Sequence, residues 1–146
     1  MPSCYDVARF FLSLVDEDAG DLMTNLKLQK LVYYAQGFHL AMYGRPLFPE
    51  RICPWEYGPV VPVLYHKLKG RGAAPISLND LDSCPHERLD NDVKKLLQEV
   101  NSVYGQFSAV RLMQMTHHEP PWKETPVGSV ISHDLMKRYF RTRLSK

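Results

Sequence analysis

The residues best suited to chemistry lie near the end of the chain, in the stretch MTHHEPPWKE from Met115 to Glu124. His117, His118 and Glu119 are side chain types that act in acid–base catalysis or bind zinc. Their spacing fits neither use: zinc proteases place two histidines four positions apart on a helix, whereas adjacent histidines point about 100° apart. The chain also lacks a GxSxG or similar nucleophile signature. We therefore predict no catalytic residue, no metal site, no cofactor and no enzyme activity.

The same stretch is better interpreted as the end of a helix. A helix over residues 109–116 would begin at the capping residue Ser108, and Pro120 and Pro121 could not continue it. Trp122 would then turn back onto the domain and anchor the segment. His118 is expected to contribute little.

A second candidate site is CPWEYGPVVP, from Cys53 to Pro62. If this segment is a strand, Trp55 and Tyr57 emerge on the same face, while Gly58 and Pro59 force the exit turn. Two interpretations are open: a corner that locks a hairpin onto the helices, or an interaction surface rich in aromatic residues.

A third candidate is the basic C-terminal segment, which carries Lys137, Arg138, Arg141, Arg143 and Lys146. A basic helix can follow phosphates or meet an acidic partner. Such charges are more often the solvated face of a terminal helix, which is the interpretation we favour.

The elements that would position these residues form a mainly α domain of about six helices. The clearest helix runs from a cap at Thr24 to Gly44, with apolar residues at steps of three and four. Its opposite side carries Lys27, Lys30, Tyr34 and Gln36 and is predicted to be a polar outer face. Four other helices are expected to begin near Ser3, Pro59 or Pro62, Asp90 and Ser132. The proline-rich segment after the second helix predicts a short hairpin over residues 47–57.

The length and composition of the chain limit the classes of protein to which it can belong. The 146 residues suit one domain, and 18 Lys and Arg against 16 Asp and Glu give a charge of +2, too small to demand a nucleic-acid partner. Three widely spaced cysteines without a CxxC pair argue against disulfides or a zinc knuckle. We see no basic leader and no long apolar run, so a cytoplasmic protein is the expectation.

Three segments taken together resemble the Panacea domain, the SocA-like antitoxin family that includes phage-associated GepA-type proteins. They are LKLQKLVYYAQGFHLAMYGRPLF (Leu26 to Phe48), WEYGPVVPVLYHKLKGRG (Trp55 to Gly72) and MTHHEPPWKE. The resemblance covers about residues 5–142, so the whole chain, 1–146, is expected to be one such domain. Pro54 and Pro120 depart from the family pattern, which often has Ala and a small polar residue there.

The resemblance implies a type II antitoxin that neutralises a cognate toxin by direct contact, the toxin being encoded beside it, often on a mobile or prophage element. Alternatives are an adaptor that delivers the toxin to a ClpXP-type protease, or a DNA-binding regulator that uses the basic final helix. Membrane contact is not expected, nucleic acid is disfavoured, and a homo-oligomer is left open. The residues expected to bind the partner are Lys27, Lys30, Tyr34, Trp55, Tyr57, Gly58 and Pro59. The motif residues expected to be structural are Leu28, Gln29, Leu31, Thr116, His117, Glu119, Pro121 and Trp122.

Overall fold

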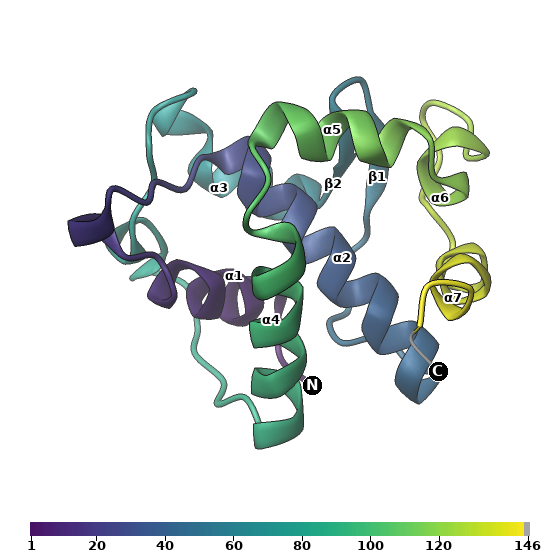
Figure 1. Cartoon of the computed structure of the whole chain (residues 1–146), viewed down its shortest axis with the longest axis horizontal. Helices are drawn as coiled ribbons and strands as arrows, with labels where there is room; N and C mark the ends of the chain where they lie inside the picture. The colour runs from purple at the N-terminus through teal and green to yellow at the C-terminus, as the bar shows by residue number, and fades with distance from the viewer. Residues whose placement is uncertain (145–146) are drawn as a thin grey trace.

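The computed structural model describes residues 1–144, so Lys146 of the basic segment lies outside the described residues. Helix α2 (Asn25–Tyr43) runs through the centre of the molecule (Figure 1). It begins as predicted, with the hydroxyl of Thr24 accepting a hydrogen bond from the backbone N–H of Lys27. It ends at Gly44, whose φ of 75° is a left-handed conformation that glycine adopts without a steric penalty.

Four helices pack around α2, and each begins at the capping residue that the sequence indicates. Ser3, Asp90, Ser108 and Ser132 each accept a hydrogen bond from the backbone N–H three residues later. These helices are α1 (Cys4–Ser13), α4 (Asn91–Tyr104), α5 (Ala109–His117) and α7 (His133–Arg141). In Figure 1, α4 and α7 lie on opposite sides of the C-terminal half of α2, while α5 crosses near its N-terminal half.

Two short α-helices and three 3₁₀ turns complete the helical part. These are α3 (Pro62–Leu68), α6 (Pro120–Lys123), η1 (Glu17–Ala19), η2 (Lys69–Arg71) and η3 (Leu78–Leu81). Helix α6 was not predicted. Pro120 and Pro121 end α5 as expected, but they also occupy the first turn of α6, where a missing N–H costs nothing.

The predicted hairpin exists but lies later in the chain than residues 47–57. Strands β1 (Cys53–Trp55) and β2 (Gly58–Val60) pair antiparallel, with Trp55 opposite Gly58. Glu56 and Tyr57 therefore form the turn, and the prediction that Trp55 and Tyr57 share one face of a strand is wrong. The fold class is confirmed: seven α-helices and one two-stranded hairpin are present in residues 1–144.

The predicted polar outer face of α2 is wrong. Lys30, Tyr34 and Gln36 are each 0% exposed, whereas the apolar residue Met42 of the same helix is 47% exposed. The reason is that α2 is covered by α1, α4, α5, α7 and the hairpin on different sides, so most of its faces are buried. Among the described residues, no helix has both the length and the apolar character of a membrane span.

Candidate protein-interaction site

The hairpin is held by side chains that bond to its backbone. From α2, the ammonium of Lys30 donates to the carbonyl of Pro59 (3.1 Å), and the amide oxygen of Gln29 accepts from the N–H of Val61 (2.9 Å). From α6, the indole N–H of Trp122 donates to the carbonyl of Trp55 (2.7 Å).

A fourth side chain that contacts the hairpin backbone is His117, whose Nε2 lies 3.0 Å from the carbonyl oxygen of Glu56. Its ring stacks on the indole of Trp122, with centroids 4.1 Å apart. We call Gln29, Lys30, His117 and Trp122 the hairpin clamp. Its members come from the first and third motif segments and act on the second, so the three segments meet at one place in the fold.

Lys30 is the most constrained member of the clamp. It is fully buried, and burial lowers the pKa of its ammonium to about 7. Gly58 allows this packing, because a Cβ at that position would lie 2.5 Å from Lys30 Cε and 2.8 Å from Thr116 Oγ1. The φ of Gly58 is 106°, which side chains rarely adopt, so the turn requires glycine for two reasons.

Glu119 joins the third motif segment to α2. Its two carboxylate oxygens accept hydrogen bonds from the hydroxyls of Tyr33 (2.9 Å) and Tyr34 (2.8 Å). Burial raises the pKa of the Glu119 carboxyl, and the hydrogen bonds from Tyr34 and Tyr33 oppose that shift. Burial, and after it the charge of this carboxylate, raises the pKa of both tyrosines, so they stay protonated donors.

The residues predicted to bind a partner divide into two groups. Trp55 is half-buried and Tyr57 is 58% exposed at the turn. The others are not free side chains at the surface: Lys30, Tyr34, Gly58 and Pro59 are buried. Lys27 is half-buried, with its ammonium donating to the carbonyl of Gly105 at 2.6 Å.

The predicted structural motif residues lie inside the domain or against the hairpin. Leu28, Gln29, Leu31, Thr116, Glu119 and Pro121 are buried, and His117 and Trp122 are half-buried. His118 is exposed. Sequence reasoning missed the aromatic neighbours of Trp55: Tyr65 and His66 on α3, whose ring centroids lie 5.1 Å and 5.9 Å from its own. Tyr65 and His66 are adjacent residues in the second half of α3, and their positions in the sequence do not indicate a contact with Trp55.

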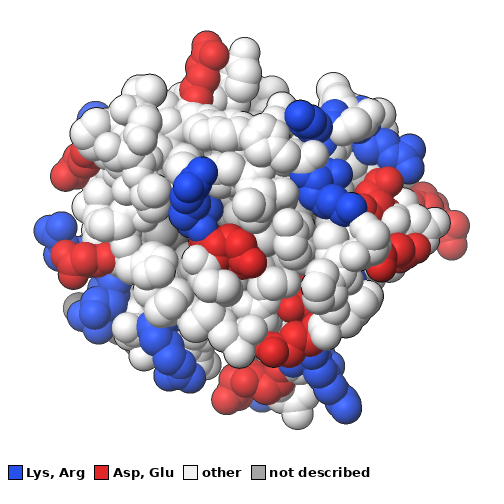
Figure 2. Space-filling view, turned by 180° about the vertical axis from the view of Figure 1, so that it is seen from behind, with Lys and Arg blue, Asp and Glu red and all other residues white. Residues whose placement is uncertain are grey.

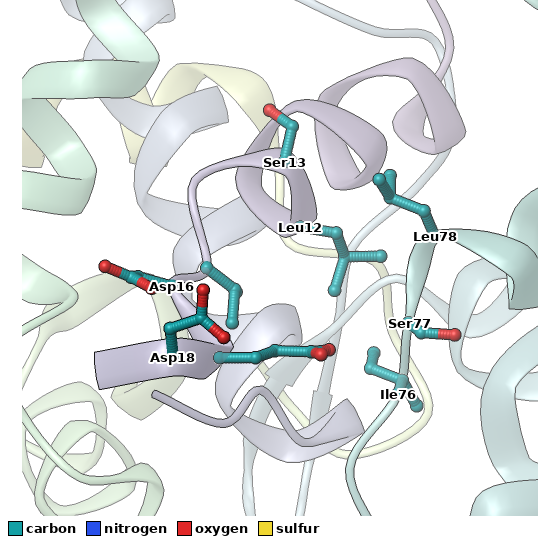
Figure 3. A pocket seen from close by; sticks show the side chains of 9 residues that line it. Leu12, Ser13, Asp16, Asp18, Ile76, Ser77 and Leu78 are labelled. Carbon is teal, nitrogen blue, oxygen red and sulfur yellow. The ribbon is translucent and has the colours of Figure 1, made fainter. Parts of the chain in front are cut away.

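Other surface features lie away from the clamp. A depression of about 390 Å³ between the end of α1 and residues 76–78 has Leu12, Ile76 and Leu78 on one side and Asp16 and Asp18 on the other (Figure 3). On the face seen in Figure 2, basic and acidic residues are interspersed, without a broad field of one sign. Within residues 1–144, no three His, Cys, Asp or Glu side chains are grouped so that they could share a metal ion.

Comparison with known proteins agrees with this arrangement of motifs. The family model described as antitoxin SocA-like, Panacea domain, matches residues 28–123. The chain belongs to this family. Antitoxin SocA of Caulobacter vibrioides (strain NA1000 / CB15N) is 32% identical over 127 residues, which cover 79% of this chain and 68% of that protein. No solved structure matches the chain significantly. The matched Panacea residues include the hairpin and every clamp residue, whereas α7 lies after the match.

Proposed function

We propose that this Panacea-domain chain is a type II antitoxin that neutralises a cognate toxin by direct protein contact, centred on the hairpin turn. The observation that carries the proposal is the hairpin clamp. Four side chains fix the backbone of residues 55–61, and the side chains of Glu56 and Tyr57 remain exposed at the turn. The name of the similar SocA protein supports the antitoxin role.

A turn held in this way is suited to binding because little of its conformational freedom is lost when a partner docks. Tyrosine is also among the residues that contribute most to protein interfaces, since it buries a large area and keeps a polar group available. Among the Phe, Tyr and Trp residues that the structure describes, Tyr57 is the most exposed, at 58%. It is therefore the residue we assign to the centre of the contact.

The hairpin should bind through side chains and not by adding a strand from the toxin. Pro54 and Pro59 face each other across the two strands, so neither can donate a backbone hydrogen bond to a further strand. The carbonyls of Trp55 and Pro59 are already occupied by the clamp. Strand addition needs a free edge, which this short sheet does not offer.

Within this proposal, Trp55 and Tyr57 contact the toxin, with Tyr65 and His66 beside them. Of the other residues predicted to bind the partner, Lys30, Gly58 and Pro59 are assigned to holding the hairpin in place. Lys27 and Tyr34, which bond to Gly105 and Glu119, are assigned to the interior of the domain. Neutralisation by contact requires no catalysis by the chain, and the cytoplasm is the proposed compartment. Association with a phage or mobile element stays a prediction.

Co-expression with the product of the adjacent gene tests the proposal. The wild-type chain should restore growth and form a complex on size-exclusion chromatography. Tyr57→Ser should weaken that complex by at least about tenfold, as expected for a central aromatic contact. The control is Val127→Ser, because Val127 is 95% exposed and lies on another loop. If the wild-type chain neither restores growth nor binds, the proposed function is wrong.

The basic side of α7 supports a second candidate, in which the chain acts as a DNA-binding regulator or a protease adaptor. Arg138, Arg141 and Arg143 are exposed, although Arg138 also pairs with Asp134 at 3.1 Å. If each of these three arginines contacts a phosphate, the logarithm of the association constant for duplex DNA should fall with the logarithm of the salt concentration at a slope of about −2.7. Binding to duplex DNA that does not change with salt, or no binding at all, would exclude the DNA role.

A further inference from the structure

A second surface of the molecule is an apolar groove over the C-terminal half of α2. It has a volume of about 550 Å³ and is lined by residues of α2, α4 and the segment after α7. The lining residues are Phe38, Met42, Leu96, Glu99, Val100, Val103, Tyr104, Arg143 and Leu144. In Figure 1, α4 and α7 stand on opposite sides of α2, and α5 covers α2 only near its other end.

The floor of the groove is firmly supported. Tyr104 stacks flat on Tyr34, with centroids 3.9 Å apart, and the hydroxyl of Tyr34 donates to Glu119. Phe38 meets the ring of Phe140 edge-on at 4.9 Å. Side chains fixed by such contacts cannot collapse to fill the groove, so it is a preformed concave surface.

The edges of the groove expose apolar side chains in a pattern suited to a helix. Met42 is 47% exposed on α2, and Val103 is 51% exposed on α4. Glu99 lies on the α4 side and Arg143 on the α7 side, so the two rims carry opposite charges. An apolar trough between two charged rims, one on α4 and the other at residues 143–144 just after α7, is suited to an amphipathic helix.

The occupant is not a helix from a second copy of this chain. Within residues 1–144, the long helices already direct their apolar faces to the core. Met42 and Val103 belong to the groove itself, and Tyr43 follows Met42 at the end of α2. Elsewhere the outer faces of these helices are polar, as Asp134, Arg138 and Arg141 on α7 show, and α5 exposes the single large apolar residue Val110. No described helix therefore offers the second apolar stripe that would fill the groove.

We propose that the groove binds an amphipathic helix of the toxin, with an acidic side chain of that helix facing Arg143 and a basic one facing Glu99. Apolar residues of the bound helix, spaced three or four apart, pack on Met42 and Val103. This inference rests on the proposed antitoxin function and adds a second contact to the one at the hairpin turn. Together the two surfaces would give a toxin one contact beside the N-terminal half of α2 and another beside its C-terminal half.

The test compares two exposed valines in the purified complex with the adjacent gene product. Val103→Asp should weaken the complex by at least about tenfold, because a carboxylate would be buried against the apolar face of the bound helix. Val110→Asp is the matched control, since Val110 is 55% exposed on α5, outside the groove, and should change affinity by less than about threefold. Circular dichroism checks folding, and Val103→Gln replaces Val103→Asp if the latter unfolds.

A photo-reactive amino acid at position 103 identifies the occupant. Cross-links to an amphipathic helix of the toxin support the inference. Cross-links to a second copy, or none to the toxin, overturn it. If Val103→Asp binds normally while Tyr57→Ser does not, the groove inference is wrong and the proposed function stands. If the wild-type chain does not bind the toxin, the proposed function fails first.

Discussion

The buried ammonium of Lys30 makes a prediction about stability and pH. Burial lowers its pKa from 10.5 to about 7 in the folded chain. Above pH 7 the unfolded chain therefore holds a proton that the folded chain has lost, so the free energy of unfolding rises with pH. From pH 7 to 8.5 the rise due to Lys30 is about 1.5 kcal/mol. The window ends there because burial raises the pKa of the Cys4 thiol, which opposes the trend above its ordinary value of 9.0.

Lys30→Met should remove this rise, since methionine has a similar shape and no titrating group. The measurement is urea unfolding followed by tryptophan fluorescence at half-unit steps from pH 7 to 8.5. Lys27→Met is the control: Lys27 is half-buried in the same helix, and replacing it should leave the rise due to Lys30 in place. A wild-type chain whose stability is flat over this range, or a Lys30→Met chain that keeps the slope, would refute the assignment of a buried, readily deprotonated lysine.

Two further substitutions test how the hairpin is held. Trp122→Ala should lower the free energy of unfolding by about 2–4 kcal/mol, because a half-buried ring and a hydrogen bond are lost, while His118→Ala should change it by less than about 0.5 kcal/mol. Equal effects in chemical denaturation would contradict the anchoring role. Gly58→Ala should cost about 2 kcal/mol or more, since its Cβ would overlap Lys30 at a φ that alanine avoids. Gly44→Ala, with a φ of 75° and no atom within 4 Å, should cost only about 1 kcal/mol, and a thermal melt that ranks the two in the opposite order would exclude the clash.

Capping residues in the sequence correctly predicted where five of the helices begin. Ser3, Thr24, Asp90, Ser108 and Ser132 were all predicted helix starts, and all five accept the capping hydrogen bond. Capping depends on residues three positions apart, so the sequence contains the whole of the interaction. The start of α6 at Pro120 was missed because two prolines were taken only as a helix stop, although the first turn of a helix accepts them.

The burial of α2 could not be predicted in the same way. Lys30 bonds to Pro59 and Gln36 to the backbone of Leu47 and Phe48, contacts that depend on the tertiary fold. An analysis of periodicity places polar residues at the surface, because it cannot show that a carbonyl far away in the sequence lies beside them in the fold. A weak signal was present: residues 31–35, LVYYA, are apolar without interruption, which is typical of a helix buried on all sides.

The side chains that hold the hairpin are different from the side chains that the hairpin exposes at its turn. Lys30, Gln29, His117 and Trp122 bond to backbone atoms of residues 55–61, and backbone atoms are the same whatever side chains follow. The side chains at positions 56 and 57 can therefore change with little effect on the hairpin's position. A fixed backbone with replaceable side chains would let the proposed contact change its partner without changing the fold. It follows that exchanging the pair Glu56 and Tyr57 should alter which toxin is bound while leaving the free energy of unfolding within about 0.5 kcal/mol.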